Sequence, residues 1–144
     1  MKGRLYERTE YYVAGSIYSK PNSKKKTATL NHITDVYNHM NIKYKKGLHW
    51  ILAGDTNDLK LDVILQLSSE MKQLVTEVTQ LNPPRILDPL ITTLGRYYQK
   101  PLVLPPLDND PDKSGSPSDH KIIKMKPISN INNKPARTKR EVTF

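Results

Sequence analysis

The sequence predicts a mixed α/β protein in which helices and loops cover a β-sheet. Residues 11–18 and 48–53 are dense in aromatic, branched and other apolar side chains, as strands are. Between them, apolar residues recur at three- and four-residue steps, as on the buried face of a helix. Strands that flank an amphipathic helix in this way are typical of α/β proteins.

The first half of the chain contains the clearest elements. The strand over residues 11–18 is closed by Lys20-Pro21-Asn22-Ser23, a turn signal. A helix is predicted over residues 27–41, and Lys45-Lys46-Gly47 ends it. Residues 48–53 then read as a buried strand, because their apolar character is nearly continuous. The apolar stripe of the helix consists of Leu30, Ile33, Tyr37 and Met40.

The second half is less regular. A short helix is predicted over residues 61–67 and a strand over residues 74–78. Another strand is predicted over residues 85–93, where Pro89 indicates an edge position or a bulge. Residues 99–117 show little periodicity and several prolines, which predicts a long, rigid loop.

These elements predict one domain. A strand over residues 120–126 follows the long loop, and the chain beyond it is polar and basic. We therefore divide the 144 residues into an N-terminal leader (1–10), a domain (11–127) and a basic tail or linker (128–144).

Charge and composition limit the expected partners. The formal net charge of +9 favours polyanions such as nucleic acid, although the same lysines could simply keep the protein in solution. The chain has no cysteine, which excludes disulfides and thiolate metal sites and fits a nuclear or cytoplasmic location better than secretion. No apolar run approaches the roughly 20 residues that span a bilayer, so we expect no membrane partner. No pattern indicates an obligate protein partner.

A first chemical motif, Gly54-Asp55-Thr56-Asn57, directly follows the strand over residues 48–53. The glycine lets the backbone turn sharply where the strand ends. Asp55 could act as a general base or bind a metal-held water, and Asn57 could orient the attacking water through its amide. The alternative is an Asx turn that closes the strand.

A second motif, Ser118-Asp119-His120, opens the last predicted strand. Asp119 could hold Mg²⁺, since hard cations prefer carboxylate oxygen, and His120 could donate to a phosphate oxygen. Asp88 stands among apolar neighbours, where a carboxylate is costly unless it is paired, and pairing with His120 would fix the imidazole tautomer. The alternatives are a surface Asp-His pair without function and an aspartate that caps the next turn. Carboxylate, amide and imidazole groups at strand ends are suited to metal-assisted phosphodiester hydrolysis.

Taken in order, these motifs resemble the endonuclease/exonuclease/phosphatase superfamily, which includes DNase I, exonuclease III and the apurinic endonucleases. The amino-acid sequence around residues 83–98 and 104–128 is most similar to the endonuclease region of animal non-LTR retrotransposons. The resemblance spans residues 11–127. The motifs that carry it are Ser16-Ile17-Tyr18 with Pro21-Asn22, Leu52-Ala53-Gly54-Asp55-Thr56-Asn57, Ile86-Leu87-Asp88 and Ser118-Asp119-His120.

The resemblance implies roles for single residues. Asp55 and Asn57 match the family's pair that activates and aligns the nucleophilic water. His120 matches the histidine that faces the scissile phosphate, and Asp88 matches the acid that supports this histidine. Asp119 matches the acid at the metal centre, which implies Mg²⁺ (or Mn²⁺) as cofactor.

The resemblance also implies how the substrate is held. Tyr18 matches a tyrosine at the phosphate pocket, although an extra residue precedes Pro21. Lys24, Lys25 and Lys26 would contact the backbone phosphates of DNA, with salt-sensitive affinity. The implied function is therefore nicking of DNA. A phosphatase of the same superfamily and a non-catalytic, basic nucleic-acid-binding remnant are the alternatives.

The fold implied by the resemblance is the C-terminal half of a two-layer β-sandwich flanked by helices. The first half of the family fold supplies an asparagine and a glutamate that holds the metal, whereas the family-like sequence here begins at a mid-domain strand. We therefore expect a truncated domain with weak or no activity, because Mg²⁺ binds weakly to one or two carboxylates alone.

Overall fold

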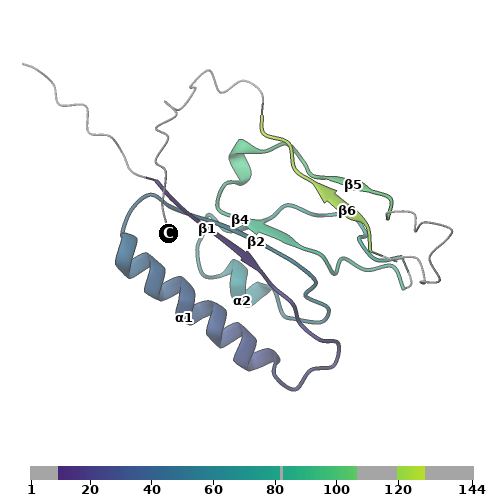
Figure 1. The fold of residues 1–144 in the computed structure, drawn as a ribbon, viewed down its shortest axis with the longest axis horizontal. Helices are drawn as coiled ribbons and strands as arrows, with labels where there is room; N and C mark the ends of the chain where they lie inside the picture. The colour runs from purple at the N-terminus through teal and green to yellow at the C-terminus, as the bar shows by residue number, and fades with distance from the viewer. Residues whose placement is uncertain (1–9, 82, 107–119, 129–144) are drawn as a thin grey trace, which may run out of the picture.

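A computed structural model describes residues 10–81, 83–106 and 120–128 (Figure 1). Over these residues the protein has a mixed α/β fold with two sheets and two α-helices, which confirms the predicted fold class. The predicted leader, except Glu10, and the predicted tail, except Ile128, lie outside the described residues. In chain order the elements are β1 (Tyr11–Ser16), α1 (Lys26–Tyr44), β2 (Leu48–Ala53), α2 (Asp62–Leu65), β3 (Lys72–Gln73), β4 (Leu90–Thr92), the 3₁₀-helix η1 (Gly95–Tyr97), β5 (Leu102–Leu104) and β6 (Ile122–Lys124).

The larger sheet has the strand order β1-β2-β4-β3. β1 runs parallel to β2, with Tyr11 opposite Leu48 and Ser16 opposite Ala53. Parallel neighbours need a crossover connection, and α1 provides it between these two strands (Figure 1). β4 is antiparallel to both β2 and β3, so the sheet is mixed.

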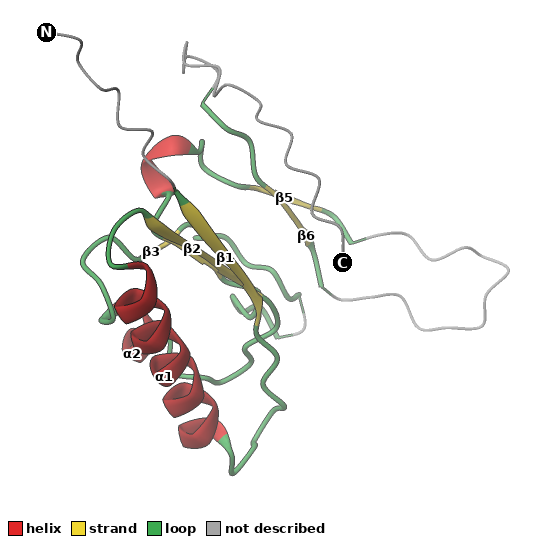
Figure 2. Ribbon diagram, turned by 60° about the vertical axis from the view of Figure 1, so that its left-hand side comes forward, coloured by secondary structure: helices red, strands yellow, loops and turns green. Residues whose placement is uncertain are grey.

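The main core lies between this sheet and the helices. Trp50 and Leu52 of β2, Ile91 of β4 and Ile64 of α2 are buried in one cluster. Figure 2 shows both helices on the same side of the sheet, with β5 and β6 away from them. The predicted apolar stripe of α1 packs against the cluster, as expected from its periodicity: Leu30, Ile33, Tyr37 and Met40.

The helix boundaries differ from the prediction by a few residues. α1 continues to Tyr44, and the chain leaves the helix at Lys45, whose φ of 38° is left-handed and whose N–H bonds the carbonyl of Asn41. α2 is shorter than its predicted segment and covers only Asp62–Leu65. Neither helix in the described part of the chain is long and apolar enough to cross a membrane.

Four strands are shorter than predicted or displaced, and the first of them, β1, ends at Ser16, two residues before its predicted end. β3 covers Lys72–Gln73, although the sequence predicted a strand over residues 74–78. β4 covers only Leu90–Thr92 because Pro89, which has no N–H for the ladder, precedes it. β6 covers Ile122–Lys124, the middle of its predicted segment.

The prediction of an unbroken loop over residues 99–117 is wrong. Within it, Leu102–Leu104 forms β5, which pairs antiparallel with β6 and sets Val103 opposite Ile123. An isolated bridge between Tyr98 and Pro127 adds to this pairing. The partner strand lies far along the chain, so local periodicity gives no sign of the ladder.

Candidate active site

The candidate site lies at one edge of the larger sheet, which we call the Asp55 end. β1 and β2 are parallel and finish there together, with Ser16 opposite Ala53. β4 is antiparallel and begins at the same edge, with Leu90 opposite Ala53. Segments from three strands therefore meet where the sequence places its polar motifs.

Asp55 and Asn57 form one hydrogen-bonded unit. The Asn57 side-chain amide donates to Asp55 Oδ1 at 2.8 Å and to the backbone carbonyl of Ser19 at 2.7 Å. The Asn57 backbone N–H also donates to Asp55 Oδ1, at 3.2 Å, in an Asx-type turn. Both side-chain N–H groups of Asn57 are thus occupied, so only its amide oxygen could orient a water.

Gly54 makes the sharp turn that brings this unit to the sheet. Its φ is +143°, and a Cβ built on it would lie 2.0 Å from the carbonyl oxygen of Ile17. The backbones cross this closely because Ile17 N–H donates to Ala53 O at 2.8 Å and Ser19 N–H donates to Asp55 O at 2.9 Å. Only glycine fits such an approach.

The register of β2 with β4 continues past the ends of both strands. Ala53 is opposite Leu90, and three residues further the Thr56 N–H donates to the carbonyl of Leu87 at 2.8 Å. The buried Thr56 hydroxyl donates to the same carbonyl at 3.1 Å. In this continued register Asp55 and Asp88 occupy facing positions, so the two predicted acids belong to the same part of the sheet edge.

Asp88 and His120 are paired directly. His120 Nδ1 lies 2.9 Å from Asp88 Oδ2 and 3.2 Å from Oδ1. The Asp88 side chain is only 18% exposed and that of His120 is 34% exposed, so this pair is partly withdrawn from water. Because Nδ1 faces a carboxylate, it carries the ring proton, which assigns any chemistry toward a substrate to Nε2.

A buried threonine that the sequence reasoning missed positions this pair. Thr79 is fully buried, and its hydroxyl oxygen accepts the backbone N–H groups of Leu87 and Asp88 at 3.0 and 3.1 Å. Its carbonyl accepts the N–H of Lys121 at 2.8 Å, and the neighbouring Gln80 forms a bridge with His120. Thr79 stands in a segment that also holds Thr76, Glu77 and Gln80, so nothing in the sequence singles it out for this role.

Two groups of predicted substrate contacts lie near this edge. Tyr18 stands between Ile17 and Ser19, and its side chain is 70% exposed. Lys24 and Lys25 are exposed before α1. Lys26 differs, because its ammonium bonds the carboxylate of Asp58, and this hydrogen bond holds the pKa of Asp58 below its usual value.

The predicted metal acid, Asp119, lies outside the described residues. Within residues 10–81, 83–106 and 120–128, no three acidic or imidazole side chains gather as a metal site. Asp55 is bonded to Asn57 and Asp88 to His120. The described residues alone therefore do not fit Mg²⁺, and no step below is routed through a metal.

No protein-family model, curated protein or solved structure matches this chain. The membership in the endonuclease/exonuclease/phosphatase superfamily therefore stays a prediction from the motifs. The geometry of the Asp55 end has to carry any functional argument by itself.

Proposed function

We propose that the Asp55 end hydrolyses phosphodiesters, with DNA as the substrate. The observation that carries this proposal is the His120–Asp88 pair, 2.9 Å apart, on the same sheet edge as the Asp55–Asn57 unit. A base, an amide oxygen and an oriented imidazole are the groups that such a hydrolysis needs. The net charge of +9 supports a polyanionic substrate.

Each side chain has a distinct task in this proposal. Asp55 takes a proton from the attacking water through Oδ2, because Oδ1 accepts from Asn57. The amide oxygen of Asn57 accepts the water's second hydrogen. His120 donates from Nε2 to a phosphate oxygen as negative charge develops there, and Asp88 stabilises the protonated ring.

Mg²⁺ (or Mn²⁺) is proposed as a cofactor that Asp119 would hold and that would neutralise charge at the phosphate, while the tasks given above to Asp55, Asn57, Asp88 and His120 are assigned without it. We propose a low rate, because the described residues add no cluster of carboxylates to Asp119. We also propose that the larger sheet is half of a two-layer sandwich. This is supported by its helices lying on one face and β5 and β6 lying away from them (Figure 2).

Nicking of supercoiled plasmid by the full chain tests the function, with Mg²⁺ present and then chelated. Asp55→Asn and His120→Asn should each lower the nicking rate by about 10²-fold or more, as expected when a general acid or base is lost. Asp88→Asn should lower it by roughly 10-fold or more, because the imidazole loses its orienting carboxylate.

Matched controls lie on the exposed face of α1. Asp35→Asn and His39→Asn make the same chemical changes at exposed positions and should leave the nicking rate unchanged. Nicking that survives both Asp55→Asn and His120→Asn would contradict the proposal. Circular dichroism of each variant separates a lost function from a lost fold.

A second candidate function is binding of nucleic acid without hydrolysis. The absence of a metal-holding cluster among the described residues and the exposure of Lys24 and Lys25 favour it. Plasmid binding that weakens steeply with salt, together with no nicking by any preparation, would support this function over the first.

A further inference from the structure

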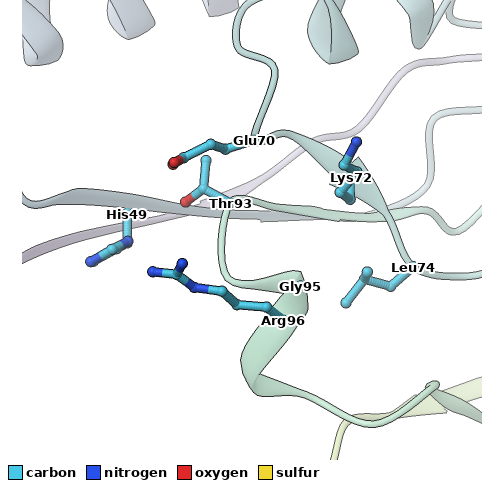
Figure 3. Close-up of a pocket in the computed structure, with 7 residues that line it drawn as sticks. All are labelled: His49, Glu70, Lys72, Leu74, Thr93, Gly95 and Arg96. Atoms are coloured by element: carbon cyan, nitrogen blue, oxygen red, sulfur yellow. The ribbon is translucent and has the colours of Figure 1, made fainter.

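A separate cavity lies at the opposite edge of the larger sheet. It has a volume of about 260 Å³ and is lined by residues from the start of β2, from β3 and its flanking residues, and from the segment that follows β4. Figure 3 shows the residues that line it: His49, Glu70, Lys72, Leu74, Thr93, Gly95 and Arg96. None of them belongs to the Asp55 end.

His49 carries a buried nitrogen that needs a partner. Its Nδ1 is buried and has no hydrogen-bond partner among the described residues, while Nε2 lies 3.9 Å from a carboxylate oxygen of Glu10. Buried polar atoms in proteins are nearly always hydrogen-bonded, so an unpaired one in a residue that lines a cavity indicates a water, an ion or a ligand as its partner.

Arg96 is one of two cationic side chains that line the cavity, the other being Lys72. In Figure 3 its guanidinium extends toward His49. The guanidinium packs on the Tyr97 ring, 4.7 Å from its centroid, and one nitrogen, Nη2, donates to the Tyr97 hydroxyl at 2.7 Å. A guanidinium has five N–H donors, and no described carboxylate lies within ion-pair distance of this one. Tyr97 therefore fixes the position of the Arg96 guanidinium, whose other N–H groups can still donate to an anion.

Other polar groups of the cavity and its volume limit the kinds of ligand that could bind. Thr93 Oγ1 accepts the N–H of Trp50 at 3.0 Å, so its hydroxyl hydrogen can be donated toward the cavity. Glu70 is an acceptor on the same wall and suits a ligand that also carries hydroxyl or amino donors. Ligand pockets usually measure about 300–1,000 Å³, so a cavity of about 260 Å³ suits a small group and not a large cofactor.

We propose that this cavity binds a phosphate group attached to a hydroxyl-bearing unit such as a sugar, with Arg96 and His49 on the phosphate and Glu70 on the hydroxyls. Arginine is suited to phosphate because its planar donors form paired, charge-assisted hydrogen bonds. The phosphate can belong to a free mononucleotide or to the backbone of a nucleic acid. This site is independent of the hydrolysis proposed for the Asp55 end.

The four histidines of the chain make a direct experiment possible. Imidazole nitrogen–proton NMR spectra of the full chain are recorded during titration with inorganic phosphate, adenosine 5′-monophosphate and a short single-stranded oligonucleotide. We expect the His49 signals to shift and saturate. His32 and His39, both exposed on α1, are internal references, and His120 reports separately on the Asp55 end.

The titrations also distinguish the two sources of phosphate. Saturation by the mononucleotide assigns the site to a free ligand, and saturation by the oligonucleotide alone assigns it to a nucleic-acid backbone. His49 signals that shift no more than those of His32 and His39 with all three probes would overturn the proposal and leave the cavity to water.

A charge-matched pair of variants completes the test. Arg96→Gln should weaken binding at His49 by roughly tenfold or more, since it removes charge-assisted hydrogen bonds. Arg85→Gln makes the same change at an exposed arginine outside the cavity and should alter the affinity by less than about twofold. Equal weakening by both variants would show nonspecific charge attraction and would also overturn the site. Unchanged His32 and His39 signals verify that Arg96→Gln is folded.

Discussion

The two ends of the larger sheet differ in how their polar side chains are hydrogen-bonded. At the Asp55 end the polar groups hydrogen-bond to one another, as Asp55 does with Asn57 and Asp88 with His120. At the other end His49 keeps a buried nitrogen without a described partner, and an exposed Arg96 lies beside an open cavity. The polar groups of the first end are therefore already hydrogen-bonded within the protein, whereas those of the second still have bonding capacity to offer a ligand.

The largest expected difference between the ends concerns their glycines. Gly54→Ala should lower the free energy of unfolding by about 3 kcal/mol, because the new Cβ would lie 2.0 Å from the Ile17 carbonyl oxygen and because the φ of +143° is strained for any residue with a side chain. Urea unfolding followed by circular dichroism measures this loss.

Gly95, which lines the cavity, is the matched control. A Cβ there would lie 3.2 Å from a terminal methyl group of Leu74, which can move, so Gly95→Ala should cost less than about 1 kcal/mol. Similar losses for the two variants would show that the Asp55 end is no more tightly built than the other.

Buried hydroxyls give the next largest contrast. Thr79→Val should cost about 2 kcal/mol, because the backbone N–H groups of Leu87 and Asp88 both lose their acceptor. Thr93→Val at the cavity end removes the acceptor of one N–H, that of Trp50, and should cost about 1 kcal/mol. Urea unfolding again gives both values, and the reverse order would contradict our account of how Asp88 is positioned.

The smallest effect concerns the exposed ion pair beside the Asp55 unit. Lys26 lowers the pKa of Asp58, so this pair stabilises the fold above the unfolded-state pKa of about 3.9 and loses its contribution as the pH falls through the lowered folded-state value. Lys26→Gln should raise the pKa of Asp58 toward its usual value, with little change in stability at neutral pH. An NMR pH titration of the Asp58 carboxyl checks this, and an unchanged titration would refute the pairing.

The sequence was informative where a pattern is local. The stripe of α1 and the apolar run of β2 each lie within one continuous segment, so the periodicity of the first and the unbroken apolar character of the second located both elements. The motif around Asp55 was also recognisable, because glycine, carboxylate and amide stand side by side in the chain. The pairing of Asp88 with His120 was anticipated from the cost of leaving a carboxylate unpaired among apolar neighbours.

The features that escaped prediction depend on contacts between distant segments. β5 exists because it pairs with β6, and its three residues are too few for a period to be recognised in them alone. Thr79 and Ser19 help to position the candidate site by accepting hydrogen bonds from distant segments. The Thr79 hydroxyl accepts from the N–H of Leu87, and the Ser19 carbonyl accepts from the side chain of Asn57. The cavity escaped notice for the same reason, since His49 and Arg96 are brought together only by the pairing of β2 with β4.

The position of Trp50 has a practical consequence. It is the single tryptophan of the chain, is 3% exposed and lies with its ring 5.2 Å from that of Tyr37 on α1. Excited beyond the absorption of tyrosine, the folded protein should emit at the short wavelengths of an indole shielded from water. A red shift of this emission would then report separation of α1 from the sheet, without any label attached to the chain.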